Sequence, residues 1–408
     1  MNILLVNHYA GNPSLGMEYR PFYFAREWRK QGHIVYIVTA SYAHLRSTQI
    51  DVQQNFTIKK LDGVCYIILK TPPYRGNTKE RIINILSFIR RLYQYKKWLP
   101  PDFKPDVIIA SSTYPLEIIP LRKMADRVNA KLIFEVHDLW PLSPIELGGF
   151  SRFHPFIMVM QYAENYAYKY SMATVSLLPK AYDHMKEHGL EADRFYHIPN
   201  GISIEDWQIR SRLPDTHDAL IKNLKEKQNF LVCYAGSIGI ANALDCFTRA
   251  AKQISHENIY FIIVGEGPQK NQLLEIAKQE KIANFTILPP IPKILIPLLL
   301  SKMDVLYVSF QRQSLFRFGI SPNKIMDYMM AGKPIIQAID AGNDMISEAK
   351  CGITVEPENI NAIADAVIQL FKMNNESRQI LGKNGKEYVI KNHDYKILAE
   401  KFLEIIRN

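Results

Sequence analysis

The chain has 408 residues, 47% of them hydrophobic and 22% charged, and this size predicts about two or three domains with sizeable cores. Its four cysteines are far apart and form no Cys-x-x-Cys pair, which argues against a disulfide framework or a zinc site and favours a reducing cytosol. The net charge is +10, and residues 1–205 carry most of it, with 25 Lys and Arg against 18 Asp and Glu. Such an excess suits an anionic membrane or a phosphorylated substrate, whereas nucleic acid is disfavoured because no zinc finger, RNA-binding signature or long basic tail is present.

The N-terminal residues lack a basic region and run directly into an apolar strand, so we expect no signal peptide. No apolar run approaches the roughly 20 residues of a membrane-spanning helix.

The first predicted elements alternate between strand and helix. They are a strand, a loop, a helix and a second strand, over residues 2–10, 11–20, 21–30 and 34–39. Continuous apolar strands joined by a helix predict a parallel α/β sheet, whose ligands bind at the carboxyl ends of the strands. We therefore expect Gly16, Glu18 and Arg20 of the first loop to meet an acceptor or a phosphate, although Arg20 is equally well explained as a solvated arginine at a helix start.

Residues 79–104 are the main basic stretch, with apolar side chains between the charges and a tryptophan near the end, Trp98. A basic amphipathic helix of this kind suits the surface of an anionic membrane, but a core-covering helix with solvated lysines would look the same. Residues 148–170 are rich in aromatic residues and methionine, which predicts either a second apolar surface under a lipid or acceptor, or simply core.

His137 and Asp138 follow directly after a strand that begins at Lys131. They should face the same carboxyl-edge crevice as the first loop, where a histidine can titrate near neutral pH or hydrogen-bond a reacting oxygen. Asp138 can orient it. The alternative is an ordinary loop histidine with its hydrogen bonds satisfied.

The second half repeats the α/β pattern after a polar linker over residues 203–228. The predicted strands and helices cover residues 229–235, 244–254, 259–264, 285–288, 304–308 and 395–406. Two glycine turns follow successive strands, one beginning at Gly236 and Ser237 and the other at Gly265. Glycine turns at strand ends let backbone N–H groups approach a phosphate, which predicts a nucleotide pocket.

The stretch Ser321–Ile336 predicts a loop, a helix, a turn and a buried strand. Ser321 is the expected N-cap and Pro322 the first helical residue. Asn323 and Lys324 then stand at a helix N-terminus, where phosphate binds readily. Asp327, one turn further on, can accept hydrogen bonds from a ribose diol. An ordinary capped helix with a solvated lysine is the alternative.

Taken together, these motifs resemble the GT-B glycosyltransferases, and specifically the family-4 retaining enzymes, over essentially the whole chain. Within that family the sequence resembles a WbuB-like branch that builds bacterial surface polysaccharides such as O-antigen or capsule. The resemblance implies an α/β fold with two Rossmann-like domains whose parallel sheets face across a cleft. We place the acceptor domain at residues 1–203, the nucleotide-sugar domain at 204–390, and a C-terminal helix that packs back on the first domain at 391–408.

The resemblance also implies the substrates. The donor is a UDP-sugar, with an N-acetylated or deoxy-amino sugar, and the acceptor a polyprenyl-diphosphate-linked glycan at the inner face of the plasma membrane. His137 matches the position that contacts the donor sugar, Gly265 lies near the nucleotide, and Pro289 and Ile291 lie beside the base. Family members of this kind use no metal, and we expect neither a metal nor another cofactor.

Two departures from the family pattern concern charge. The usual Glu-x7-Glu pair reads Gly319 and Asp327, and the usual arginine of the first C-domain loop reads Ser237. The nearby candidates to meet the pyrophosphate are Arg312, Arg317 and Lys324, and we expect Lys324 first and Arg317 second. Two other functions stay open: a non-hydrolysing UDP-sugar 2-epimerase, which needs no acceptor, and a non-catalytic sugar-nucleotide-binding protein.

Overall fold

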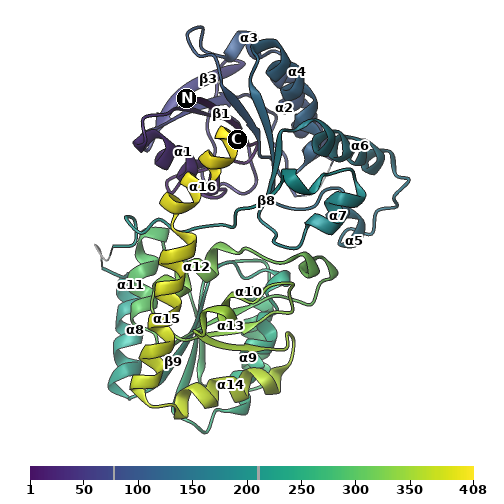
Figure 1. The fold of residues 1–408 in the computed structure, drawn as a ribbon. Coiled ribbons are helices and arrows are strands. Elements are labelled where there is room, and N and C mark those ends of the chain that lie inside the picture. Colours follow the sequence, from purple (N-terminus) through teal and green to yellow (C-terminus); the bar gives the residue numbers. More distant parts are fainter. Residues whose placement is uncertain (77–78, 209–211) are drawn as a thin grey trace. The chain divides into compact units, whose positions relative to one another are not determined.

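The computed structural model describes residues 1–76, 79–208 and 212–408, which form two compact units (Figure 1). Unit 1 comprises Met1–Asn200 and Tyr395–Asn408, and unit 2 comprises Gly201–Asp394. Part of the predicted linker is helix α8, Asp215–Glu226, while its residues 209–211 lie outside the described part of the chain.

Unit 1 is built on an eight-stranded sheet with the order β3-β4-β2-β1-β5-β6-β7-β8. Its strands are Asn2–Val6, Ile34–Ala40, Phe56–Leu61, Val64–Leu69, Val107–Ala110, Lys131–Val136, Ala173–Ser176 and Phe195–His197, numbered β1 to β8 in chain order. All neighbours pair in parallel except β3 and β4, an antiparallel hairpin at the sheet edge that the sequence reading did not include. The first strand ends at Val6, four residues earlier than expected, and His8 and Tyr9 belong to the loop after it.

The helices of unit 1 confirm several predicted segments. They are α1 (Arg20–Lys30), α2 (Lys79–Leu92), α3 (Tyr95–Trp98), α4 (Ile118–Val128), α5 (Leu142–Glu146), α6 (Pro155–Tyr170), α7 (Tyr182–Glu187) and α16 (Tyr395–Arg407), with short 3-10 turns η1 (Pro115–Glu117) and η2 (Ala192–Arg194).

The chain returns to unit 1 with α16, which lies beside α1 (Figure 1). The Trp28 indole N–H donates to the Ala399 carbonyl, 3.1 Å away, and the Trp28 ring meets Phe402 edge to face at 5.3 Å. Because Trp28, Phe402 and Leu398 are almost fully buried in one apolar cluster with residues of β1 and β2, α16 is part of the unit 1 core.

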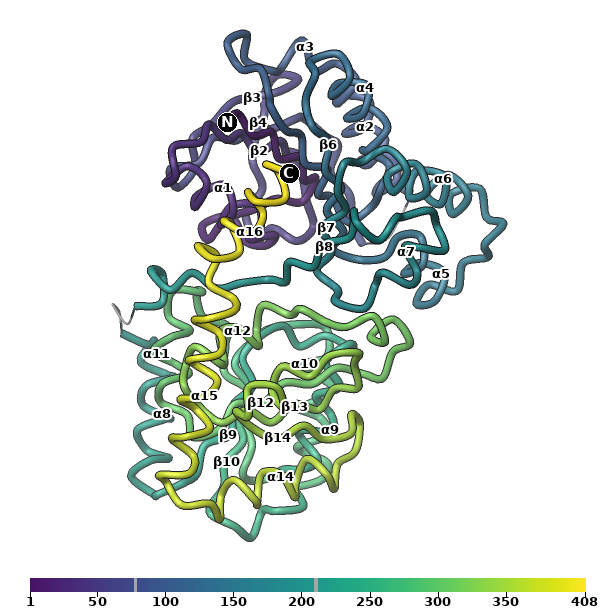
Figure 2. Tube along the Cα trace, in the orientation of Figure 1, coloured from purple at the N-terminus to yellow at the C-terminus, as the bar shows by residue number. Residues whose placement is uncertain are grey.

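Unit 2 is an all-parallel six-stranded sheet with the order β11-β10-β9-β12-β13-β14 (Figure 2). The strands β9 to β14 are Phe230–Ala235, Ile259–Val264, Phe285–Leu288, Val305–Ser309, Ile335–Ala338 and Gly352–Val355. Alternate residues of β9 enter different cores: Leu231 and Cys233 pack on one face of the sheet, and Val232 and Tyr234 on the other. Both faces are covered, which explains why the strands read as continuous apolar runs.

Helices cover the two faces of the unit 2 sheet. They are α8, α9 (Leu244–Gln253), α10 (Lys270–Gln279), α11 (Ile296–Ser301), α12 (Asn323–Met330), α13 (Met345–Ala349), α14 (Ile360–Lys372) and α15 (Asn375–His393), with 3-10 turns η3 (Ile240–Asn242), η4 (Lys293–Leu295) and η5 (Ser314–Phe318).

The start of α12 differs from its prediction. The helix begins at Asn323, so Pro322 stands at the N-cap position, where no side chain caps the helix. Proline has no side-chain acceptor, and Ser321 is one residue too early to serve as the cap. Gly332 ends the helix as predicted, with φ at +65°.

Candidate functional site

A buried ion pair lies at the carboxyl edge of the unit 1 sheet. The Arg20 Nε donates to Glu135 Oε1 at 2.9 Å, and both side chains are 1% exposed or less. Other guanidinium N–H groups of Arg20 donate to the carbonyls of Ile198 and Pro199. Both expectations for Arg20, an anion-binding residue and a solvated arginine at a helix start, therefore need correction: its guanidinium is enclosed and already bonded, and it joins the start of α1 to β6 and to the segment after β8.

His137 lies next to this pair. Its Nε2 is 3.0 Å from Ser111 Oγ and 3.3 Å from Glu135 Oε2, and the Ser111 hydroxyl donates to the same carboxylate oxygen. Glu135 rather than Asp138 supplies the carboxylate at this nitrogen, while Asp138 is exposed. The orienting partner expected for His137 thus comes from within β6 and not from the residue after it.

Glu135 stays ionised despite its burial. Burial alone would raise the pKa of this carboxyl, but the Arg20 charge and the hydrogen bonds from His137 and Ser111 outweigh it and lower the pKa to about 2. An ionised carboxylate only accepts hydrogen bonds, so the His137 Nε2 carries a proton and faces Glu135. The other ring nitrogen, Nδ1, is then left as an acceptor or as a second donor.

The loop between β1 and α1 is tightly folded on itself. The Gly11 N–H donates to the Glu18 carbonyl at 2.8 Å, and the Glu18 N–H to the Tyr9 carbonyl at 3.2 Å. Gly16 has φ of +104°, and a Cβ there would lie 2.8 Å from the Ser47 nitrogen. Close packing against the Ser47 backbone thus explains why residue 16 is a glycine. The backbone of Glu18 closes the loop, whereas its side chain is partly exposed.

In unit 2, Lys324 reaches from α12 onto the turn after β9. Its Nζ donates to the Tyr234 hydroxyl at 2.6 Å and lies 3.8 Å from the centre of that ring. A Cβ on Gly236 would be 2.7 Å from the Lys324 Cε and 2.8 Å from Nζ. Gly236 is therefore the residue that leaves room for the lysine.

A second residue of the same helix fixes this arrangement. The Tyr328 hydroxyl, one turn after Lys324, accepts from the Ala235 N–H at 2.8 Å. The side chains of Lys324 and Tyr328 thus both contact the end of β9, because residues four apart lie on one helix face.

Lys324 is a weakened base in this position. Burial lowers the pKa of the ammonium group from 10.5 to about 7, although part of the side chain remains open to solvent, which screens the effect. Burial likewise raises the pKa of Asp327, with the Lys293 charge acting against it. Lys324 can therefore gain a proton when an anion arrives beside it.

In the two glycine turns, the N–H groups of the first glycines already donate hydrogen bonds to backbone carbonyls of the protein. The Gly236 N–H donates to the Val264 carbonyl at 2.9 Å, and the Gly265 N–H to the Leu288 carbonyl at 3.1 Å. A Cβ on Gly265 would lie 1.9 Å from the Gly236 carbonyl oxygen. The prediction that these two N–H groups bind a phosphate is therefore wrong, because both are hydrogen-bonded within the sheet. The glycines are instead required because the two loops approach each other closely.

The other predicted nucleotide-binding residues are dispersed around this turn. Ser237 is exposed, and its carbonyl accepts from the Tyr234 hydroxyl at 2.6 Å. Pro289 is exposed with its carbonyl bound to the buried His217 Nε2, at 2.9 Å, and Ile291 is partly buried in the core beneath. Ser321 and Asn323 are partly exposed beside Lys324 in the chain.

The two arginines considered for the pyrophosphate lie in other surroundings. Arg312 forms exposed ion pairs with Asp340 and Glu356, at 3.4 and 2.7 Å. Arg317 is exposed, donates to the Ser314 carbonyl at 2.7 Å and covers the Phe318 ring. Lys324 is therefore the predicted cation that the structure brings to the Gly236 turn.

Gly319 explains one departure from the family pattern. It ends η5 with φ of +98° and ψ of 174°, a conformation that is essentially restricted to glycine. A carboxylate residue at this position would strain the backbone, so the conformation of the chain at position 319 accounts for glycine where the family pattern has an acid.

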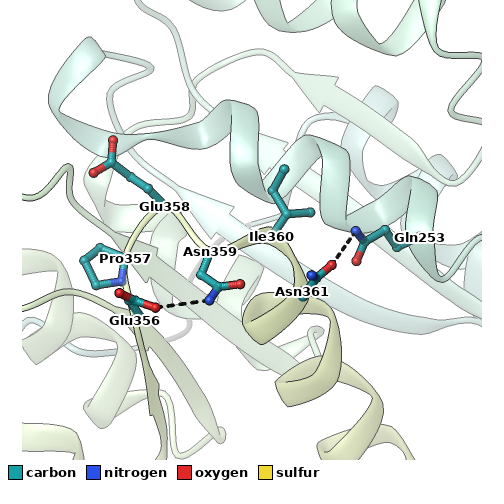
Figure 3. A pocket seen from close by; sticks show the side chains of 7 residues that line it. All are labelled: Gln253, Glu356, Pro357, Glu358, Asn359, Ile360 and Asn361. Carbon is teal, nitrogen blue, oxygen red and sulfur yellow. Dashed lines mark hydrogen bonds between the residues drawn. The ribbon is translucent and has the colours of Figure 1, made fainter.

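A shallow cavity of about 400 Å³ lies elsewhere in unit 2, at the start of α14 (Figure 3). It is lined by Gln253 and residues 356–361. Its polar side chains pair with each other, as Asn359 does with Glu356 at 3.1 Å and Gln253 with Asn361 at 2.8 Å. None of the predicted site residues lines it, and its glutamates would repel a phosphate.

The two halves of the chain match two glycosyltransferase family models. Residues 16–206 match Glycosyltransferase Family 4, and residues 216–388 match Glycosyl transferases group 1. The chain is a glycosyltransferase.

The chain is also similar to known proteins over almost its whole length. The glycosyltransferase is 23% identical over 407 residues to an Escherichia coli K12 protein with the name "Putative colanic acid biosynthesis glycosyl transferase WcaI", covering 93% of this chain and 94% of the relative. It resembles the solved sucrose-phosphate synthase of Thermosynechococcus elongatus with a TM-score of 0.75 at 15% identity, over 100% of this chain and 98% of that one. Anabaena Alr3699/HepE in complex with UDP gives a TM-score of 0.70 at 13% identity, over 100% of both chains. The predicted α/β fold of two Rossmann-like domains is thereby confirmed.

Reasoning from sequence missed three residues of the glycosyltransferase: Glu135, Ser111 and Tyr234. Glu135 stands two residues before the predicted His137 at the end of a strand, a spacing that places both side chains on one face, so a signal for Glu135 was available. Ser111 follows the neighbouring strand β5, whose Ala110 is in register with Phe134. Tyr234 lies inside a continuous apolar strand and carried no signal.

Proposed function

We propose that this glycosyltransferase moves a sugar from a UDP-linked donor, held by unit 2, to a polyprenyl-diphosphate-linked glycan, held by unit 1. The product would belong to a bacterial surface polysaccharide, and the sugar would be N-acetylated or deoxy-amino. Two findings support this proposal: the name of the relative concerned with colanic acid, and UDP bound to a protein of the same fold. The observation that carries it is Lys324 on the Gly236 turn at the carboxyl edge of a parallel sheet.

Lys324 is proposed to stabilise the diphosphate that leaves. The negative charge on the leaving group grows during transfer, and a lysine already positioned by Tyr234 and Tyr328 contacts would meet it without reorganisation. The N-terminus of α12 adds a partial positive charge at the same point. Transfer is proposed to need no metal and to retain the anomeric configuration.

His137 is proposed to position the donor sugar. Since its Nε2 proton faces Glu135 and Ser111, Nδ1 is the ring nitrogen left to hydrogen-bond a sugar hydroxyl. Glu135 and Ser111 hold the ring in this orientation and act through His137 rather than on the sugar.

A membrane surface is the proposed location of the acceptor. On α2 the side chains of Ile83 and Leu86 are 57% and 52% exposed, and on α6 Met158 and Tyr162 are 56% and 61% exposed. Both helices contact α4 and the 3-10 turn η1 that precedes it in unit 1. None of the helices in the described part of the chain is long and apolar enough to cross a membrane. Apolar side chains beside the basic residues of α2 therefore support peripheral binding.

Donor binding is tested by calorimetric titration of the purified protein with UDP, GDP and ADP. We expect UDP to bind selectively and Lys324→Ala to weaken it at least tenfold, a loss of about 1.4 kcal/mol. Lys383→Ala, a 73% exposed lysine of α15, is the matched control and should bind UDP like the parent. Tighter binding of GDP would change the donor class, and equal binding by Lys324→Ala would remove the proposed role of this residue.

Turnover is tested by following release of UDP from a panel of UDP-sugars, with and without polyprenyl-diphosphate-linked glycans. Release should require the acceptor, and His137→Ala should lower kcat by a factor of about 10² or more. Conversion of a UDP-sugar without acceptor would instead indicate an epimerase. Binding of UDP without any turnover would indicate a sugar-nucleotide-binding protein.

A further inference from the structure

Three side chains of the types that bind metals meet between α6 and α7 in unit 1. Glu164 comes from α6, and His184 and His188 are one helical turn apart at α7. One prospective ligand atom from each residue lies within 4.8 Å of the other two. None of the three belongs to the candidate site described above.

Glu164 is a buried carboxylate with few partners. It is 1% exposed, and it accepts hydrogen bonds from the Tyr168 hydroxyl at 3.0 Å and the Gln161 amide at 2.7 Å. The remaining partner is His184, whose Nε2 is 3.2 Å from Glu164 Oε1. A buried carboxylate needs a compensating positive charge, and within the described residues the side chain in ion-pair range is a histidine, which carries a charge only when it is protonated.

The two imidazole rings lie together, with centres 4.6 Å apart. Two rings this close, with ligand atoms within 4.8 Å of one another and of Glu164, are placed to share one cation. The Gln161 amide contacts Glu164 and also the His188 Nδ1, at 2.9 Å, and Asn165 lies 3.1 Å from that same nitrogen. These amides hold two of the prospective ligands in place, as outer-shell groups do around bound metals.

We propose that Glu164, His184 and His188 bind one zinc ion. Two imidazole nitrogens and one carboxylate oxygen are a typical zinc ligand set, and water can complete the tetrahedron. The ion would replace the proton between Glu164 and His184 and supply the positive charge that the buried carboxylate lacks. The scattered cysteines argued against a zinc site, but this set of ligands contains none.

The proposed ion ties α6 to α7. Zinc that binds only the folded state raises its stability, so its effect would be on unit 1 rather than on the chemistry of transfer. It therefore does not depend on the proposed donor or acceptor, and the proposed transfer does not depend on it.

Zinc binding is tested on the full-length protein after treatment with a chelator and removal of the chelator. Titration with Zn²⁺ should show one site, and saturating Zn²⁺ should raise the melting temperature. Co²⁺ in its place should give the visible absorption of a tetrahedral site with nitrogen and oxygen ligands. No rise in melting temperature for the parent protein, or no bound ion at one per chain, would overturn the proposal without recourse to any variant.

Variants then locate the ion. His188→Ala should weaken zinc binding at least about tenfold and abolish the rise in melting temperature. His188 is partly exposed, so this variant is expected to fold, and Glu164→Gln, which keeps the shape of the side chain, should have the same effect. His256→Ala, whose side chain is 70% exposed in unit 2, is the matched control and should bind zinc like the parent. Equal loss in the His256→Ala control, or none in His188→Ala, would indicate an adventitious ion only.

Discussion

At Glu135, burial and charge act on one carboxyl group in opposite directions. Its pKa falls from an ordinary 4.5 to about 2, because Arg20, His137 and Ser111 together outweigh the effect of burial. A carboxyl with a lowered pKa stabilises the fold fully above its unfolded pKa, near 4.5, and this contribution is lost as the pH falls toward 2. The pair with Arg20 should therefore be intact at neutral pH and fail only in strong acid.

Replacing Glu135 by Gln should be strongly destabilising. The variant leaves the buried Arg20 guanidinium without its counter-charge, which typically costs about 3–5 kcal/mol of unfolding free energy. Scanning calorimetry should show a lower melting temperature, and the double variant Arg20→Met/Glu135→Leu should recover part of the loss because no unpaired charge remains. A melting temperature for Glu135→Gln equal to that of the parent would contradict this account of the pair.

The pKa of Lys324 predicts how UDP binding depends on pH. Below pH 7 the lysine is protonated and attracts the diphosphate; above pH 7 the free protein loses this charge, so affinity should fall by up to about tenfold per pH unit. Calorimetric titration with UDP between pH 6 and 9 measures this change in affinity. Lys324→Arg remains charged over the whole range and reports any titration of the ligand itself, so the difference between the two proteins is the informative quantity. Identical pH profiles would show that Lys324 does not titrate in this window.

Single residues were predictable from the sequence where chemistry follows from position. Lys324 at a helix N-terminus and His137 at a strand end both lie where the alternation of strands and helices put them. For Arg20 neither expectation, an anion or solvent, was right, because its partners are more than 100 residues away in the chain: Glu135 and the carbonyls of Ile198 and Pro199. A pattern of local spacing contains no information about such contacts.

Helix α2 is divided between core and solvent in a way that its composition alone left open. Ile85, Phe88 and Leu92 are buried, whereas Ile83 and Leu86 are more than half exposed. The interpretation as a core-covering helix thus holds for one face of α2, and the proposed membrane contact concerns the other, exposed face.

Replacing Ile83 by Asp should weaken membrane binding. Burying one such apolar side chain contributes roughly 1.5–3 kcal/mol, so sedimentation with phosphatidylglycerol vesicles should fall at least about tenfold. Ile294→Asp is the matched control, since Ile294 is 59% exposed and lies in unit 2. Equal sedimentation of both variants would argue that the exposed face of α2 does not bind lipid.

Elements with one dominant pattern were predicted best. The parallel strands around β9 and the helix after Lys324 were found because both faces of the sheet are apolar and because Gly332 marks a helix end. The β3–β4 hairpin was missed since β3 is largely exposed and polar, with Lys59 and Lys60 at its centre. Its pairing depends on the neighbouring β4 rather than on its own sequence.

At the scale of the whole molecule, α16 is a structural part of unit 1. Replacing the buried Phe402 by Ala should cost about 3–5 kcal/mol, because the cavity would open against Trp28 and Phe24. Calorimetry should show a lower melting temperature for Phe402→Ala. Lys401→Ala, which changes an exposed neighbour on the same helix, should melt at the same temperature as the parent. If Phe402→Ala melted like the parent, α16 would be dispensable to the core.

The return of the chain to unit 1 has a consequence during protein synthesis. Unit 2 is inserted between two parts of unit 1, and its own ends are adjacent, since the Ile202 N–H donates to the His393 carbonyl at 2.8 Å. All residues of unit 2 are therefore translated before those of α16. The nascent unit 1 must keep the α1 face that α16 will cover, including Trp28 and Phe24, unprotected while about 190 further residues are translated and folded. The domain translated first is thus completed last.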